Sequence, residues 1–131
     1  MINQTKPHDT MRPFFIRLQA KTGMTNQEVA AWLDVSIKTI ESWRSGKKLP
    51  QSYEPFERII KLIHNMELEA NKKVQDIDDN PAPKRIELVE PKDDIEALAM
   101  GWPYQSVYKM VIADILAQCP EDLDRIEIIW T

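Results

Sequence analysis

Four side chains in the segment 37–42 differ in the contacts that they can offer to a partner. Lys38 can donate to guanine O6 and N7, and Glu41 can accept a hydrogen bond from cytosine N4. Ile37 can cover a thymine methyl group, and Ser42 can serve donor or acceptor bases. This set suits contact with base-pair edges in a DNA major groove, so we expect these four residues to touch bases. The alternative for each of them is an ordinary solvent-exposed helix face.

Amide and basic side chains on both sides of this segment are suited to phosphate. Asn26 and Gln27 stand at the start of an expected helix, where free N–H groups and the helix dipole favour anions. Lys47 and Lys48 follow the segment in a short loop and can neutralise phosphate charge. We therefore expect these four residues to contact the DNA backbone.

Two further residues of the same segment have more than one interpretation. Arg44 could reach the DNA backbone or form an ion pair with Glu41, and we group it with the expected phosphate contacts. Trp43 could stack on nucleic acid, but its spacing of three from Ile40 favours a place in the core.

Two short helices joined by a tight turn must position these side chains. Thr25 is a good N-cap, and Glu28 follows at the spacing of a capping box. Ser36 caps a second helix, and Gly46 is placed to end it. Only residues 34 and 35 separate the first helix from the second cap. So short a link forces the helices to cross steeply, as in a helix-turn-helix whose second helix enters the major groove.

The residues at the crossing fit this geometry. Ala30 is small enough for the closest approach of the helices, and Val29 and Leu33 share its apolar face. Asp34 stands at the turn, where positive φ is needed and is tolerated by Asp better than by a branched residue. Ile40 follows as a buried aliphatic. An ordinary helical hairpin is the alternative, and the agreement of caps, small residue and turn disfavours it.

These motifs resemble the lambda-repressor-like (Cro/repressor, XRE-type) domains. The similar runs are TNQEVA at 25–30, VS at 35–36 and IESWRSGK at 40–47. The family pattern has a Thr-Gln start, a Gly turn, a Val-Ser cap and a Trp-x-x-Gly close. This chain departs from it at Asp34, where Gly is usual, and at Arg44, where an acidic residue is common. The resemblance implies a compact bundle of helices that binds DNA.

A second, short motif lies downstream. The run GWPYQSV at 101–107 is similar to the C-terminal signature of the YdiL-like family of bacterial helix-turn-helix proteins. That family includes repressors associated with anti-CRISPR operons, which would imply a repressor here too. Within the run, Trp102 and Tyr104 could pack at a hinge or stack on single-stranded RNA bases.

The remaining patterns indicate a mainly α protein: a lambda-repressor-like helix-turn-helix bundle with a small C-terminal α/β extension of helices and two short strands. We expect a polar tail at 1–10, the DNA-binding domain at 11–75, a linker at 76–83 and a docking or dimerisation subdomain at 84–131. Helices are expected at 11–22, 53–74, 93–100 and 103–118, with strands at 84–90 and 125–130.

The charge is distributed unevenly along the chain. The formal net charge is −4, yet residues 1–50 hold eight Lys/Arg and four Asp/Glu, a balance of +4. Residues 76–131 hold five Lys/Arg and thirteen Asp/Glu, a balance of −8. The positive part coincides with the expected DNA-binding unit, as a phosphate-contacting surface requires.

Several protein classes fit the sequence poorly. No apolar run approaches the ~20 residues of a membrane span, and no signal peptide is recognisable, so we expect a cytoplasmic protein. The single Cys119 and two separate histidines predict neither a disulfide nor a metal site, and no cofactor is implied. No catalytic cluster or phosphate loop is recognisable either, so we do not expect an enzyme.

A two-stranded ribbon is marginal alone, so residues 84–131 must dock on the bundle or on another subunit. We expect a homodimer through this subdomain, although its apolar side chains could instead fill the core of one chain. These side chains are Val107, Met110, Val111, Ile115, Leu116, Ile128 and Trp130. The hypothesis is a sequence-specific transcriptional regulator that represses by occupying a double-stranded DNA operator. The alternatives are a protein-binding adaptor or antitoxin-like module with autoregulatory DNA binding, and an RNA-binding regulator.

Overall fold

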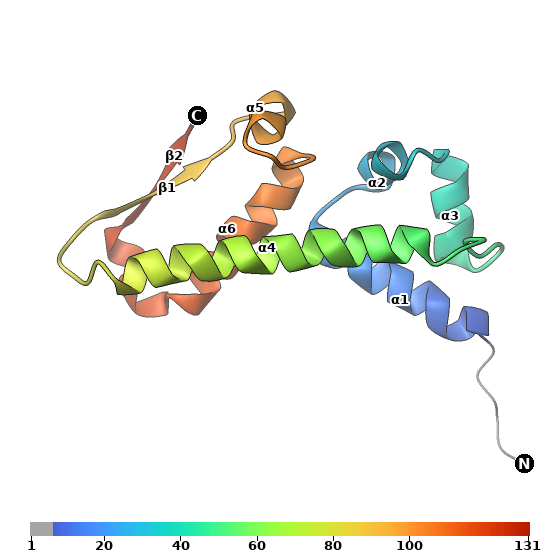
Figure 1. Ribbon diagram of the computed structural model, residues 1–131, viewed down its shortest axis with the longest axis horizontal. Helices are drawn as coiled ribbons and strands as arrows, with labels where there is room; N and C mark the ends of the chain where they lie inside the picture. Colours follow the sequence, from blue (N-terminus) through green and yellow to red (C-terminus); the bar gives the residue numbers. More distant parts are fainter. Residues whose placement is uncertain (1–6) are drawn as a thin grey trace, which may run out of the picture. The chain divides into compact units, whose positions relative to one another are not determined.

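A computed structural model describes the backbone of residues 7–131 and the side chains from Thr10 onward. The fold is mainly α with a small two-stranded sheet near the C-terminus, which confirms the expected fold class (Figure 1). The chain divides into two compact units, Met1–Ile63 and His64–Thr131. The boundary falls inside one long helix, whereas we expected a domain to end at 75 and a linker to follow.

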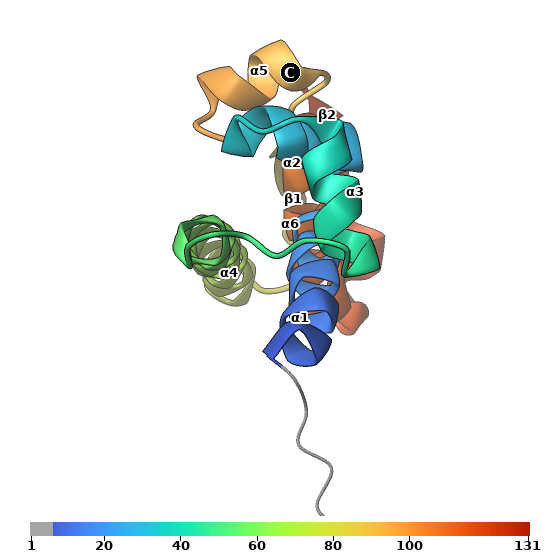
Figure 2. The same cartoon turned by 90° about the vertical axis from the view of Figure 1, so that its right-hand side faces the viewer.

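Unit 1 contains α1 (Pro7–Thr22), α2 (Asn26–Leu33), α3 (Ile37–Ser45) and the first turns of α4 (Glu54–Asp78). The first helix begins at Pro7, four residues before the expected start, because proline suits the first turn, where its missing N–H removes no bond. Residues 1–6 of the expected tail lie outside the described part of the chain. The second and third helices cross steeply (Figure 1, Figure 2), which is the predicted helix-turn-helix geometry.

Each expected cap of the two motif helices is present. Thr25 and Glu28 form a capping box, with bonds of 3.1 and 3.0 Å between each side chain and the other's backbone N–H. Ser36 Oγ accepts from the Thr39 N–H at 3.1 Å. Asp34 lies in the left-handed region at φ 58°, and Gly46 ends α3 at φ 80°. These contacts fix both ends of the turn with residues close in sequence.

Aromatic rings hold α3 in the core of unit 1. Trp43 is 7% exposed and meets Phe15 edge-on at 5.5 Å between ring centroids. Phe56 of α4 packs against Phe15 at 6.1 Å and against Phe14 at 5.3 Å. Ile40 is fully buried. The predicted core position of Trp43 is therefore confirmed.

Unit 2 contains the rest of α4, β1 (Ile86–Glu90), α5 (Asp94–Ala99), α6 (Gln105–Gln118), the 3-10 helix η1 (Pro120–Arg125) and β2 (Ile126–Trp130). The two strands pair in parallel, with Ile86 opposite Ile126 and Glu90 opposite Trp130. Parallel strands need a long crossover, and α5 and α6 provide it.

Some of the apolar side chains that we considered for a dimer surface are buried, and others are exposed. Val107, Val111 and Ile115 lie on the buried face of α6 and fill the core of unit 2. Met110 is 38% exposed and Trp130 61% exposed. Leu116 and Ile128 are half-buried. Only the exposed members of the set remain free for a second subunit.

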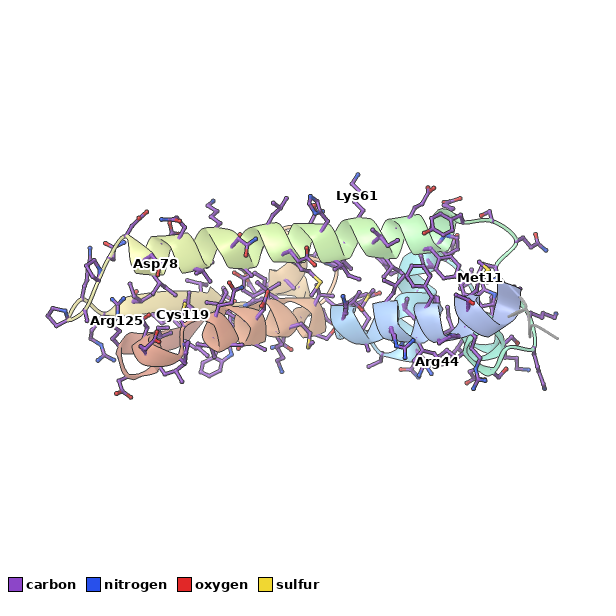
Figure 3. The ribbon with its side chains drawn as sticks, turned by 90° about the horizontal axis from the view of Figure 1, so that it is seen from below. Met11, Arg44, Lys61, Asp78, Cys119 and Arg125 are labelled. Atoms are coloured by element: carbon purple, nitrogen blue, oxygen red, sulfur yellow. The ribbon has the colours of Figure 1, made fainter. Side chains whose placement is uncertain are left out.

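Arg125 joins the end of α4 to the segment before β1 (Figure 3). Its Nε donates to Asp122 Oδ1 at 2.7 Å, and Nη2 donates to Ile77 O at 3.2 Å. Nη1 donates to the carbonyl oxygens of Asn80 and Lys84. One guanidinium thereby binds carbonyl groups in the last turn of α4 and in the segment that follows it.

Candidate nucleic-acid interface

The third helix presents two different faces. Ile40 and Trp43 are buried, whereas Ile37, Lys38 and Glu41 are exposed, and Ser42 is half-buried beside them. Ile37 is 38% exposed, a large fraction for an aliphatic side chain in the first turn of a helix. The capped turn and the aromatic core orient this face outward.

Three of the four expected base contacts surround one hollow. Lys38, Glu41 and Ser42 line a concavity of about 390 Å³ together with Ser45 and Lys47. An ammonium donor, a carboxylate acceptor and hydroxyl groups therefore share one surface. Ile37 does not line it.

Ser45 is a member of this surface that sequence reasoning missed. It lies three residues after Ser42 and four after Glu41, a helical spacing that places all three on one face. Its hydroxyl donates to Ser42 O at 3.2 Å and accepts from the Lys47 N–H at 3.4 Å. The spacing alone could have identified it.

The start of α2 offers backbone donors as expected. Within the described residues, the capping box occupies the N–H groups of Thr25 and Glu28, while those of Asn26 and Gln27 have no partner. Gln27 is exposed and Asn26 half-buried. Unpaired N–H groups at a helix start are suited to an anion.

Arg44 makes a contact with α1 that we did not expect. Its Nη1 donates to Gln19 Oε1 at 2.8 Å, so in the described structure it contacts α1 rather than Glu41. In addition, Arg12 of α1 donates a hydrogen bond from Nε to Arg44 O at 2.7 Å. The sequence did not indicate Gln19, a polar residue that is only 5% exposed.

Gln19 also connects to the start of α2. Its Nε2 donates to Asn26 Oδ1 at 2.9 Å and to Met24 O at 3.2 Å. A single buried amide therefore joins Arg44 to Asn26, two residues that we expected to contact phosphate independently. This connection fixes both side chains relative to α1.

The two loop lysines are both exposed but face different hollows. Lys47 lines the same hollow as Lys38 and Glu41, whereas Lys48 lines a separate hollow beside the start of α4. The Lys48 N–H donates to Ser42 O at 3.3 Å, which holds the loop against α3. Residues 1–63 hold ten Lys/Arg and six Asp/Glu, a balance of +4, so the surrounding unit is positive.

Residues 11–64 match a family model described as an antitoxin Xre-like helix-turn-helix domain. The matched residues include α2 and α3 and are similar to Xre-type helix-turn-helix domains. The match ends one residue after the end of unit 1 and does not reach the run at 101–107. No curated protein matches the chain. Among the described residues, no helix has the length and apolarity needed to cross a membrane.

Proposed function

We propose that this protein is a sequence-specific DNA-binding transcriptional regulator that represses by occupying an operator. The observation that supports this function best is a hollow on the outer face of α3. It brings together Lys38, Glu41 and Ser42, whose chemistry suits base edges, with Lys47, whose charge suits phosphate.

In this proposal the Xre-like domain docks α3 in the major groove. Ile40 and Trp43 hold the helix from below, so its exposed residues meet the bases without reorganisation. The unpaired N–H groups of Asn26 and Gln27 bind one phosphate, and Lys47 and Lys48 bind the backbone on the other side of the groove. Arg44 acts mainly through Gln19, by fixing α3 on α1.

A homodimer would place two copies of α3 on two half-sites. One short helix contacts only a few base pairs, so paired domains are usual for this motif. The exposed Met110 and Trp130 of unit 2 are available for such an interface. The resemblance of residues 101–107 to the YdiL-like family supports a repressor rather than an activator.

Selection with the purified full-length chain tests this function. Random duplex DNA and random RNA pools are offered in parallel, and bound molecules are sequenced. A repressor should enrich an inverted repeat in duplex DNA, with half-sites about one helical turn apart. Enrichment of RNA alone, or of DNA without a motif, would contradict the proposal.

A second candidate is an antitoxin-like module, in which the helix-turn-helix serves autoregulation and unit 2 binds a protein. The description of the matched family favours it. So does the short helix α5, where Ile95 is 79% and Leu98 69% exposed. Capture of one defined protein by the full-length chain, and its loss with Ile95→Asp and Leu98→Asp, would support this candidate over a free-standing repressor.

A further inference from the structure

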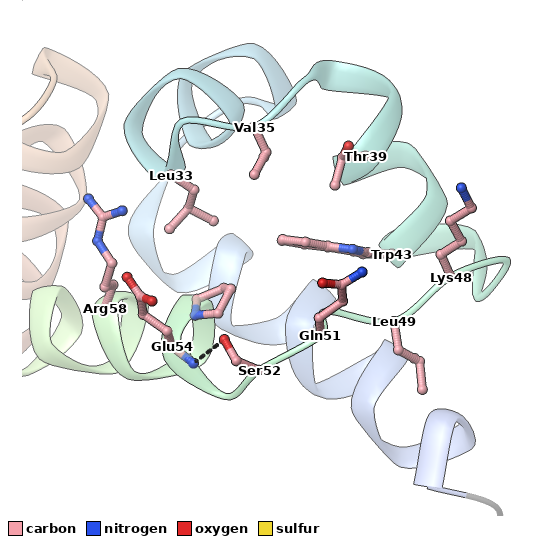
Figure 4. A pocket seen from close by; sticks show the side chains of 11 residues that line it. Leu33, Val35, Thr39, Trp43, Lys48, Leu49, Gln51, Ser52, Glu54 and Arg58 are labelled. Carbon is pink, nitrogen blue, oxygen red and sulfur yellow. Dashed lines mark hydrogen bonds between the residues drawn. The ribbon is translucent and has the colours of Figure 1, made fainter.

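A second hollow lies within unit 1, between α3, the loop at 46–53 and the start of α4 (Figure 4). It is open to solvent and has a volume of about 450 Å³, which lies within the range of small-molecule sites. The expected DNA contacts at Lys38 and Glu41 do not line it. Its function is therefore not explained by base contact.

Trp43 forms one side of this hollow and presents an unused hydrogen-bond donor. The side chain is 7% exposed, and its indole N–H has no partner among the described residues. Every described side-chain nitrogen or oxygen that is shielded from solvent has a hydrogen-bond partner. The indole nitrogen must therefore be reached by solvent, and the hollow is the space that Trp43 lines.

The lining of the hollow is mixed: Thr39, Gln51 and Ser52 contribute hydroxyl and amide groups, and four apolar side chains complete the wall. Leu33 and Val35 of the helix-turn-helix lie on the side of the hollow toward which the ring of Trp43 points (Figure 4). Leu49 of the loop and Pro55 of α4 also line the hollow. An aromatic ring is a favourable surface for a second planar group. A ligand in this hollow would thus bury a flat apolar body.

The charged groups at the rim are two cations and one carboxylate. Lys48 has no partner for its ammonium among the described residues, and Glu54 lies at the start of α4. Arg58 is held in place: it lies 4.8 Å over the Trp32 ring and donates through Nη2 to Trp32 O at 2.9 Å. Its remaining donors have no partner within the described structure. The excess of donors favours a single negative charge on the ligand.

We propose that this hollow binds a small carboxylic acid with a planar apolar body. The ring of the ligand packs between Trp43 and the aliphatic wall, and its carboxylate accepts from the Trp43 indole N–H and from Lys48. This site lies apart from the expected base contacts and shares only Lys48 with the expected phosphate contacts, and its existence does not depend on DNA binding.

Occupation of the hollow would affect DNA binding, a consequence that rests on the proposed function. Thr39 and Trp43 belong to the same helix as Lys38 and Glu41. Lys48 is an expected phosphate contact, and a bound carboxylate would compete for its charge. We therefore expect a ligand to lower the affinity for an operator.

The site is tested without DNA, by titrating the ¹⁵N-labelled full-length protein with 1-naphthoate. The chain has four tryptophans, whose indole N–H resonances are assigned by single Trp→Phe variants. If Trp43→Phe does not fold, the other three variants assign Trp43 by elimination. We expect a saturable shift of the Trp43 resonance with half-saturation on the order of 1 mM, and no shift of Trp102 or Trp130.

Adjacent lysines provide matched variants. Lys48→Met should weaken 1-naphthoate binding by about three- to tenfold, whereas Lys47→Met, which alters the other hollow, should leave it unchanged. The neutral 1-naphthalenemethanol should bind more weakly than the acid. An unmoved Trp43 resonance at about 10 mM 1-naphthoate, equal shifts of all four indoles, or equal effects of the two lysine variants would overturn the site.

A separate measurement tests the consequence for DNA. The affinity for a selected operator is compared in 1-naphthoate and in 1-naphthalenemethanol. Equal affinities would overturn the regulatory consequence while the site stands. A protein that binds 1-naphthoate but no DNA would contradict the proposed function and not the site.

Discussion

Gln19 Oε1 accepts a hydrogen bond of 2.8 Å from Arg44 Nη1, although 25 residues separate the two in the chain. The same amide donates to Asn26 Oδ1 at 2.9 Å. One buried side chain of α1 therefore fixes the end of α3 and the start of α2. Residues expected at the DNA backbone are positioned by a helix that we did not assign to the interface.

Replacing Gln19 should destabilise the helix-turn-helix. Gln19→Leu removes the hydrogen-bond partner of Arg44 and Asn26 at a buried position. We therefore expect the free energy of unfolding to fall by about 1–3 kcal/mol. Urea denaturation of the full chain measures it. Arg17→Ala, on the exposed face of α1, should change stability by less than about 0.5 kcal/mol. Equal effects of the two variants would show that the network contributes nothing.

Lys38 and Lys47 should differ in their effect on DNA binding, although they share a hollow. Lys38→Ala should relax the preference at particular base positions, at a cost of about 1–3 kcal/mol on the best operator. Lys47→Ala should weaken all sequences alike and reduce the slope of log affinity against log salt by about one. Binding is measured over a panel of operator variants and salt concentrations. A uniform loss from both variants would contradict base contact by Lys38.

Arg125→Lys should destabilise unit 2. An ammonium cannot reproduce the fork of bonds that joins Asp122, Ile77 and Lys84. We expect a loss of about 2–3 kcal/mol and faster hydrogen exchange in the last turn of α4. The exposed Arg85 provides a control, since Arg85→Lys should leave both measurements unchanged.

Tyr108 should make stability fall at alkaline pH. Its hydroxyl donates to Glu69 Oε2 at 3.1 Å, and burial first, then the carboxylates of Glu69 and Glu90, raise the pKa of Tyr108 well above 10.0. Unfolded tyrosine ionises near pH ~10. Below that pH the contribution of the protonated Tyr108 hydroxyl to stability is fully present. Above it the unfolded chain loses a proton that the folded chain keeps, so stability declines until the folded pKa is reached.

The Tyr108→Phe variant isolates this contribution. Its free energy of unfolding should lack the decline that the parent chain shows from about pH 9 to about pH 11. At neutral pH it should be less stable by about 1 kcal/mol, because Glu69 loses a donor. Tyr53→Phe is the control, since Tyr53 is 49% exposed, and it should follow the parent curve. Parallel curves for Tyr108→Phe and the parent would contradict the assignment.

The features that the sequence determined by itself are those whose partners lie within a few residues. Thr25 with Glu28, Ser36 with Thr39, and Gly46 fix helix ends through bonds inside one turn. Their spacing therefore predicts them without a fold. The outward face of α3 follows in the same way, because helical periodicity separates Ile40 and Trp43 from Lys38 and Glu41.

Only the tertiary structure decided the features that depend on distant partners. The side chain of Arg44 could reach solvent, Glu41 or another helix, and the packing of α1 selected Gln19. The strands could have paired in either direction, and the crossover through α5 and α6 made them parallel. Lys47 and Lys48 are neighbours of the same type, yet the path of the loop gives each a different hollow. Local propensity does not predict these contacts. They depend on the packing energy between elements that are far apart in the sequence and meet only when the chain folds.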